Sequence, residues 1–296
     1  MDATVRSLHR YPVKSMLGET VDELVIGPAG VVGDRGYAVL DAADGSVASA
    51  KHPRKWAGLL GFRAAYLAEP RLGEPLPAVA ITFPDGDTRR SDDPDLDAAL
   101  SAALGRRVRL TSQIPEQPVF EEQWPDIDGI APQQFIRATT TSHTGGDAVS
   151  TLQLGMMAPG SFLDLAVLHV MTTATLDKLS AAAPGSTFDV RRYRPNVLLD
   201  VPGAGFAEDG WVGATLALGA AAIRVSIPTM RCVMTTLAQG GLPEDRDTLR
   251  TIAKLNRRTI PDLGTWACAG VYADVARPGT VRRGDPAHVD TGARTS

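Results

Sequence analysis

Short apolar runs separated by glycine- and proline-containing turns constrain this fold more than any other feature. The 296-residue chain carries 29 glycines and 21 prolines spread along its length. Turns at such short intervals favour short strands, which are predicted at Ala3–Leu8, Glu19–Ile26, Arg35–Leu40 and Phe162–Met171. Repeated short strands of this kind pair in barrels or antiparallel sheets. The sequence therefore predicts a β-rich α+β fold.

A few segments have the spacing and end residues of helices instead. One helix is predicted after Asp93, an N-cap candidate, with Gly105 as its C-terminal stop. Thr172 or Thr173 can cap a second. Charges alternate with apolar residues at helical spacing in Pro243–Leu255, which predicts a third.

Periodicity disappears in residues 112–150, where proline and polar residues dominate. The segment Pro115–Pro125 is the predicted boundary between a domain at 1–120 and a domain at 121–296. Residues 138–150 are expected to form an exposed, mobile loop. Such a loop is either a plain connection or a lid over an active site.

Composition excludes several classes of protein. A net charge of -4 argues against a general nucleic-acid binder. The start of the chain lacks the apolar run of a signal peptide, and no stretch approaches the ~18 apolar residues of a membrane span. With only two cysteines, neither a disulfide scaffold nor a four-cysteine cluster can form in this chain. We expect a cytoplasmic protein without a membrane span.

The two cysteines differ in their surroundings. Cys232 follows a predicted strand and is adjacent to Arg231, which favours a thiolate if the side chains meet. It is either a metal ligand or nucleophile, or a buried residue that packs as a small hydrophobe. Cys268 has no charged neighbour in the sequence and is predicted to be a core residue.

Three turns carry cationic residues: Lys14–Ser15, Asp34–Arg35 and Arg191–Asn196. Lysine and arginine bind phosphate, so these turns can form one anion-binding pocket, or they can be solvated surface charges. Spacing along the chain leaves both readings open. The histidines lack metal-site spacing, and no glycine-rich nucleotide motif or serine-hydrolase motif is present.

Several separate blocks of sequence resemble one known family in order and content. The blocks are Tyr11–Ser15, Gly33–Arg35, Ala50–Arg54, Tyr193–Val197, Arg231–Thr236, Gly270–Tyr272, Pro278–Thr280 and Gly284–Pro286. They resemble the MOSC-domain proteins with an N-terminal β-barrel extension, which include the mitochondrial amidoxime-reducing components and their bacterial relatives. The resemblance implies a MOSC β-barrel domain at 121–296 and a smaller N-terminal β-barrel-like domain with one or two helices at 1–120.

The same resemblance implies a molybdenum cofactor, molybdopterin, with Cys232 as the ligand of the metal. Asp164 matches an acidic residue near the metal, so the implied catalytic residues are Cys232 and Asp164. The positions that match pterin- and phosphate-binding residues are Lys14, Ser15, Arg35, Arg194, Asn196 and Arg231. The implied activity is reduction of small N-hydroxylated compounds at the N–O bond, with Asp164 or a water supplying protons.

The sequence also departs from the family pattern. The family often has a polar residue two positions before the metal-binding cysteine, whereas this chain has Met230. The cysteines needed for a ferredoxin-like domain are missing, so electrons are expected from a separate protein of the ferredoxin, flavin or cytochrome type. Met230 keeps two alternatives open: a sulfur carrier or cofactor-storage protein, and a fold that has lost molybdenum and uses Cys232 as a thiol.

Overall fold

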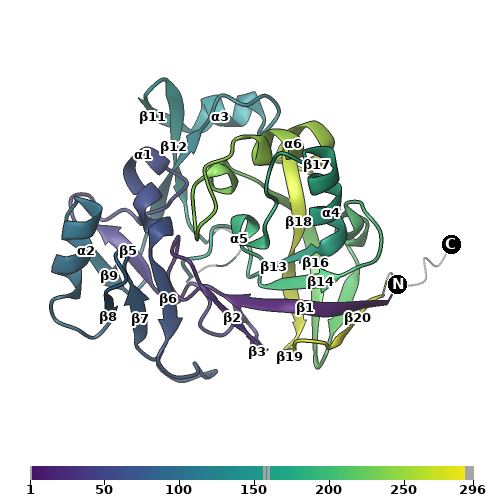
Figure 1. Cartoon of the computed structure of the whole chain (residues 1–296), viewed down its shortest axis with the longest axis horizontal. Coiled ribbons are helices and arrows are strands. Elements are labelled where there is room, and N and C mark those ends of the chain that lie inside the picture. The colour runs from purple at the N-terminus through teal and green to yellow at the C-terminus, as the bar shows by residue number, and fades with distance from the viewer. Residues whose placement is uncertain (1, 156–157, 159–160, 291–296) are drawn as a thin grey trace.

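Seven strands from both ends of the chain close into one barrel in the computed structural model (Figure 1). The structure describes residues 2–155, 158 and 161–290. The barrel strands, in spatial order, are β13 (Leu168–Thr172), β14 (Val197–Asp200), β1 (Asp2–Arg10), β20 (Pro286–Asp290), β15 (Thr215–Leu218), β16 (Ala221–Met230) and β18 (Gly264–Arg277). Pairing of β13 with β18 closes the ring. The predicted β-rich α+β class and the barrel are thus confirmed.

Strand β1 links the two ends of the chain. It pairs antiparallel with β14, through Leu8 and Val197, and antiparallel with β20, through Ala3 and Ala287. Two strands extend the same sheet: β2 (Glu19–Val21) beside β1, and β17 (Arg257–Ile260) beside β18. The N-terminal strand is therefore an integral part of the barrel.

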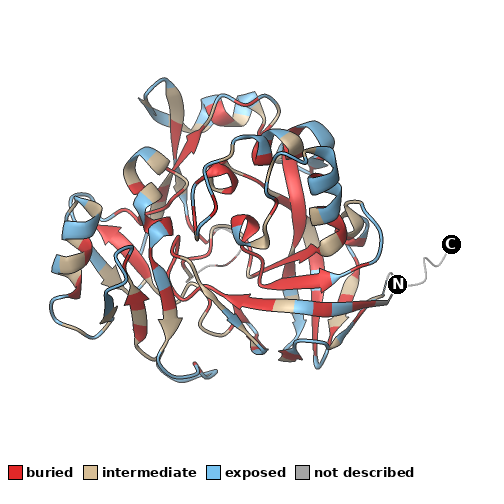
Figure 2. Cartoon of the chain, in the orientation of Figure 1, coloured by how far each residue is buried: buried red, intermediate tan, exposed pale blue. Residues whose placement is uncertain are grey.

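Aliphatic side chains fill the interior of the barrel. Val5, Leu8, Val170, Leu199 and Leu216 are buried and belong to one continuous core cluster. Burying an aliphatic side chain of this size stabilises the fold by about 1.5–3 kcal/mol, and inward positions alternate with outward ones along each strand. Figure 2 shows the result: the barrel strands are largely buried, and the exposed residues gather on outer helix faces and loops.

The residues between β2 and β10 form several small sheets and two helices. Their bounds are β3 (Glu23–Gly27), β4 (Gly30–Val31), β5 (Ala38–Asp41), α1 (Pro53–Trp56), η1 (Ala57–Gly61), β6 (Arg63–Tyr66), β7 (Val79–Thr82), β8 (Thr88–Arg90), α2 (Leu96–Leu104) and β9 (Val108–Thr111). Trp56, Phe62 and Leu100 lie in a second core cluster. However, β3 pairs with β19 (Gly279–Arg282), so a strand pair joins this part to the end of the chain. The division at residue 120 stays a prediction.

The predicted helices are present. Helix α2 ends at Gly105, which has the left-handed conformation of a C-cap, but it begins at Leu96 because Asp93 accepts a hydrogen bond from Asp95 N in a preceding turn. Helix α4 (Thr173–Ala182) is capped by the Thr172 hydroxyl, which accepts from Thr175 N at 3.2 Å. The amphipathic segment contains α6 (Asp247–Leu255), which packs on β18.

Two segments differ from the expectations. The mobile loop predicted at 138–150 is wrong, because α3 (Gln133–Thr139) leads there into a β-hairpin. Its strands β11 (Thr140–Thr144) and β12 (Asp147–Gln153) are joined by two glycines with positive φ. Strand β12 also pairs with β10 (Val119–Trp124).

The apolar run Phe162–Met171 is a strand only from Leu168 onward. Phe162 and Leu163 are buried in a loop instead, where the Phe162 carbonyl accepts from Lys14 Nζ at 3.0 Å. The remaining short helices are α5 (Val190–Tyr193), η2 (Ala207–Trp211) and η3 (Val233–Thr236). In the described ranges, the helices are all too short or too polar to cross a bilayer.

Candidate active site

The cationic turns and Cys232 meet in one cavity at a rim of the barrel. Strands β1 and β16 end at this rim, and β13 and β14 begin there. Eight residues named from the sequence line the cavity: Lys14, Ser15, Arg35, Asp164, Arg194, Asn196, Arg231 and Cys232. Since Lys14 and Arg194 are each less than a tenth exposed, the solvated-surface reading is wrong for these two cations, whereas Arg191 is exposed.

Three of the lining residues occupy a strained backbone conformation. Ser15, Arg35 and Arg194 have φ values of 63°, 48° and 56°. Among the described non-glycine residues, only Asp262 shares this left-handed region. The conformation costs a residue with a side chain roughly 1–2 kcal/mol. Strain concentrated in this way is typical of sites where function, rather than stability, fixes the backbone.

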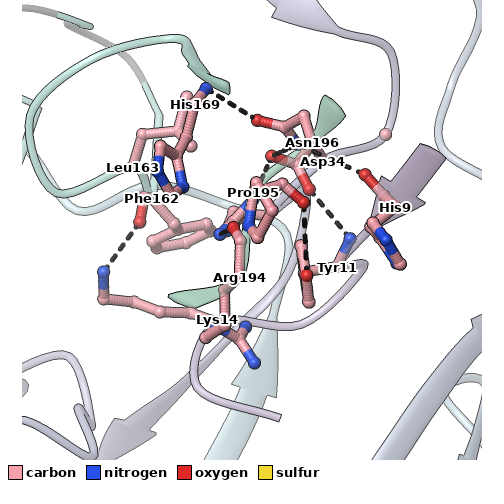
Figure 3. Close-up of polar contacts among 12 residues, drawn as sticks. His9, Tyr11, Lys14, Asp34, Phe162, Leu163, His169, Arg194, Pro195 and Asn196 are labelled. Carbon is pink, nitrogen blue, oxygen red and sulfur yellow. Dashed lines mark hydrogen bonds and ion pairs between the residues drawn. The ribbon is translucent and has the colours of Figure 1, made fainter. Parts of the chain in front are cut away.

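Asn196 and Asp34 hold the turns together beneath the cavity (Figure 3). The Asn196 amide accepts from His169 N at 3.1 Å and donates to Asp34 Oδ2 at 2.9 Å. The other Asp34 oxygen accepts from Tyr11 N at 2.8 Å, and Arg35 pairs with Asp34. Because both ends of the Asn196 amide are engaged within the protein, this side chain fixes β13, β14 and the first turn relative to one another.

Two buried arginines at the cavity have no carboxylate partner among the described residues. Arg194 donates to Met16 O at 2.7 Å and lies over the ring of Tyr11. Arg231 donates to the carbonyls of Tyr193 and Ala269. Burial, assisted by nearby Arg35, lowers the pKa of Arg194 to about 10. The cavity therefore carries positive charge that the protein does not neutralise.

The lysines of the cavity, in contrast, are paired. Lys14 binds Asp164, and Lys51 Nζ lies 3.4 Å from Asp164 Oδ2 and 3.2 Å from Glu122 Oε2. Burial alone would raise the pKa of Asp164, but Lys14 and Lys51 outweigh it and hold that pKa below the usual range. Asp164 is therefore ionised at neutral pH and does not store a proton.

Cys232 is half-buried and is the N-cap residue of η3, two positions after the end of β16. Burial raises the pKa of its thiol to about 11, and Lys51 offsets only part of this effect. The guanidinium of Arg231 is held by Ala269 O and Tyr193 O. The Arg231 guanidinium is thus engaged elsewhere, and burial favours the neutral thiol in the free protein, whereas binding to a metal would deprotonate the sulfur. Cys268 is fully buried in the core, as predicted.

Two family models match this sequence. The MOSC domain matches residues 141–288, and the MOSC N-terminal beta barrel domain matches residues 2–57. The chain belongs to the MOSC-domain family. This family is associated with the molybdenum cofactor. The likeness to the amidoxime-reducing members remains a prediction.

Solved structures also show likeness to this MOSC protein. The YuaD protein from Bacillus subtilis is 10% identical over 98% of this chain and 96% of its own, with a TM-score of 0.41. YiiM from Geobacillus stearothermophilus is 16% identical over 42% of this chain and 54% of its own, with a TM-score of 0.29. None of the curated proteins compared with the sequence matches it.

The residues of the MOSC cavity fit an anionic cofactor that carries its own metal ligands. Arg194 suits a phosphate, because arginine can donate two parallel hydrogen bonds to such oxygens, and Arg231 adds positive charge. Among the residues the structure describes, no group of three or more His, Cys, Asp or Glu side chains could hold a metal. One thiol is sufficient only when the cofactor supplies the other ligands.

Several lining residues were missed by sequence reasoning. Lys51 and Tyr272 lie in blocks that carried the family resemblance, but nothing in those blocks indicated that they face the cavity. His169 lies in β13, and its ring nitrogen Nε2 hydrogen-bonds Arg231. Burial first, and Arg231 second, lower the pKa of His169 well below its ordinary value, so this ring is neutral. An isolated histidine in an apolar strand gives no signal of this role.

Proposed function

We propose that this MOSC protein binds a molybdenum cofactor in the cationic cavity and reduces small N-hydroxylated compounds to amines or amidines. One observation carries the proposal: Cys232 and two buried, uncompensated arginines share a single cavity. The thiol supplies the single protein ligand that such a metal needs, and Arg194 and Arg231 supply charge for a phosphate.

The protein's contribution is to bind and orient. Lys14, Ser15, Arg35 and Arg194 would hold the pterin and its phosphate, together with Arg231. Asn196 would act indirectly, since its amide is occupied in positioning Asp34 and β13. When bound, the cofactor supplies the two-electron chemistry that takes an oxygen atom from nitrogen.

Lys51 and Asp164 are ionised groups near Cys232, and their charges suggest a role for each. Lys51 is a cation that favours a thiolate at Cys232, and Asp164 holds both Lys51 and Lys14 in place. Asp164 would therefore orient the lysines and accept hydrogen bonds from water in the cavity. Water is the proton source in this proposal, because the pKa of Asp164 is too low for it to hold a proton.

Electrons would come from a separate donor protein of the ferredoxin, flavin or cytochrome type. Cys268 is enclosed in the core, so the two cysteines of this chain cannot hold an iron–sulfur cluster. We propose a cytoplasmic location for the same reactions, where thiols stay reduced.

Metal content tests the cofactor. Protein produced in a molybdenum-replete host is expected to contain close to one molybdenum per chain by elemental analysis. Cys232→Ser is expected to lose the metal, whereas Cys268→Ala, the matched control in the core, is expected to keep it. Absence of molybdenum from the unmodified protein would overturn the proposal.

Turnover separates the enzyme from a carrier. The loaded protein is expected to convert benzamidoxime to benzamidine with a chemical reductant, measured by chromatography of the product. A fully loaded protein that is inert toward benzamidoxime would support cofactor storage instead. Met230 lines the cavity beside Cys232. It stands where the family often has a polar residue, and this departure is the reason for testing cofactor storage as the alternative.

A further inference from the structure

A second cavity opens beside Cys232 on the side away from the cationic turns. Its volume is about 300 Å³. It shares Lys51, Asp164, Met230 and Cys232 with the cationic cavity, together with Leu165, Arg231 and Tyr272. The two cavities therefore meet at the residue proposed to bind the metal. A molecule in the second cavity would reach that point without displacing a group held by the cationic turns.

Aromatic and aliphatic side chains form the walls of this second cavity. Three rings pack against one another: Trp124 and Phe135 are 5.9 Å apart between centroids, and Phe135 and Trp266 are 5.1 Å apart. Phe120, Leu152 and Leu263 complete the apolar lining. Walls of this composition favour a planar, apolar ligand, because ring faces and edges attract other aromatic groups.

The polar atoms of the two tryptophans are already satisfied within the protein. Trp124 Nε1 donates to Ser150 Oγ at 2.8 Å, and Trp266 Nε1 donates to Leu263 O at 2.8 Å. These indoles therefore offer a ligand their ring surfaces and no hydrogen bond. Selectivity along this wall has to come from shape and apolar contact.

Charged groups stand at the inner end of the same cavity. Glu122 is buried there and pairs with Lys51, which also lies near Asp164. Both carboxylates can accept a hydrogen bond from an N–H or O–H group, and Lys51 can donate one. A ligand with an apolar ring and one compact polar end would thus fit with the polar end toward Cys232.

Elements within residues 119–153 build much of this wall. Phe120 and Trp124 lie on β10, Phe135 lies on α3 and Leu152 lies on β12. Strands β10 and β12 belong with β11 to a three-stranded sheet beside the barrel, and α3 leads into β11 (Figure 1). All four residues lie outside the segment 138–150 that was expected to be a loop.

We infer that this second cavity binds the apolar, aromatic body of the substrate and so selects aryl N-hydroxylated compounds over small aliphatic ones. The inference rests on the proposed function for the chemistry at Cys232. The aromatic selection itself depends only on Trp124, Phe135 and Trp266.

Isothermal titration calorimetry on the cofactor-loaded protein, with no reductant present, tests the selection without turnover. Benzamidoxime and acetamidoxime share the same N–O end and differ in the ring. We expect benzamidoxime to bind at least about 10-fold more tightly. Phe135→Ala is expected to remove most of this difference while leaving the affinity for acetamidoxime unchanged.

The matched control is Phe206→Ala. Phe206 is also partly buried and packs on the same core cluster as Phe135, but it does not line the second cavity. Its variant is expected to retain the preference for benzamidoxime. If Phe135→Ala does not fold, as judged by circular dichroism, Phe135→Leu keeps an apolar side chain and still removes the ring.

The outcomes separate this inference from the proposed function. Equal affinities for the two amidoximes, or a preference that survives both Phe135 variants, would overturn the inference even if benzamidoxime is turned over. Ring-dependent binding that is lost in Phe135→Ala, with no turnover in the presence of reductant, would uphold aromatic binding and contradict the reductase.

Discussion

Ser15 occupies a backbone conformation that glycine adopts more easily than other residues. We therefore expect glycine at this position to be more stable than alanine, the reverse of the usual order. Its φ is 63°, and its hydroxyl accepts from Ala50 N at 3.1 Å. Alanine and glycine both lose that hydrogen bond, but only glycine relieves the strain. We expect Ser15→Gly to be more stable than Ser15→Ala by about 1 kcal/mol in urea denaturation.

Ser101 provides the control for this comparison. It lies within α2, where the backbone is helical, and glycine there is less stable than alanine by about 1 kcal/mol. The order of the two substitutions should therefore be opposite at Ser15 and Ser101. The same order at both positions would show that the turn at Ser15 carries no strain.

Arg192 and Arg194 are both buried, but they are expected to respond differently to loss of charge. Arg192 donates to four carbonyl groups, those of Thr187, Thr235, Leu237 and Pro243. Arg194 donates from its Nη1 atom to Met16 O.

Removing Arg192 leaves several buried acceptors unsatisfied, each costing about 1–3 kcal/mol. In cofactor-free protein we expect Arg192→Met to lower the free energy of unfolding by at least about 3 kcal/mol. Arg194→Met should change it by about 1 kcal/mol or less, because the desolvated charge disappears with the hydrogen bond. Thermal and urea denaturation measure both. Equal losses would contradict the assignment of Arg194 to ligand binding rather than to stability.

The site residues could be predicted from the blocks that resemble the family, but not from the spacing of residues along the chain. The cationic turns, Asn196 and Cys232 lie together in one cavity, as the family blocks implied. The ionisation of Cys232 and Asp164 was not predictable, because it depends on Lys51 and on burial. Lys51 lies far from both residues in sequence, and no local pattern indicates which side chains a fold will bring into contact.

His9 makes the contribution of β1 depend on pH. The ring is buried, with Ser7 Oγ 2.9 Å and Thr20 Oγ1 3.3 Å from its nitrogens. Burial lowers its pKa from 6.5 to about 4, although Asp189 acts in the opposite direction. The unfolded chain therefore takes up a proton near pH 6.5, and the folded strand does so only near pH 4. Stability is lost as the pH falls through that interval.

The expected loss attributable to His9 is at most about 3 kcal/mol. The free energy of unfolding of the unmodified protein and of His9→Gln is measured at pH 7.5 and at pH 4.5. The loss is the change in the difference between the two proteins from one pH to the other. His169 is common to both proteins and cancels from the difference. A difference that does not change with pH would show that the folded ring is accessible to protons.

The hairpin at β11 and β12 shows why one element escaped prediction. β11 is made almost entirely of threonine, serine and histidine, and none of its residues is buried. It lies at the edge of its three-stranded sheet. A strand with two polar faces lacks the apolar alternation on which strand prediction depends, although its two-glycine turn is a hairpin signal. Strands with a buried face, such as β1, carry the alternation and were predicted.

At the scale of the whole molecule, the barrel requires strands from both ends of the chain. We expect a fragment of residues 121–296 to lack cooperative unfolding, because it leaves a gap between β14 and β20 where β1 lies. Thermal denaturation followed by circular dichroism measures this. The predicted division at residue 120 would then describe sequence families rather than independent folding units.

A rearranged chain provides the control for this prediction. Asp2 lies opposite His288 at the junction of β1 and β20, so a short loop can join residue 290 to residue 2. A protein running from 121 to 290, through that loop and on through residues 2–31, restores β1 and β3. It is expected to unfold cooperatively. Cooperative unfolding of the unmodified 121–296 fragment would show that the barrel closes without β1.

Because β1 is translated first and β20 last, β1 must wait for this partner while the chain is being synthesised. A ribosome adds roughly 5–20 residues per second, so about 15–60 s pass between the translation of β1 and that of β20 in this 296-residue chain. During this interval the edge of β1 at Asp2–Thr4 lacks the partner that β20 provides. An unpaired edge is the part of a strand that aggregates. Slow-growing nascent chains should therefore depend on a holding chaperone in proportion to the delay before β20 emerges.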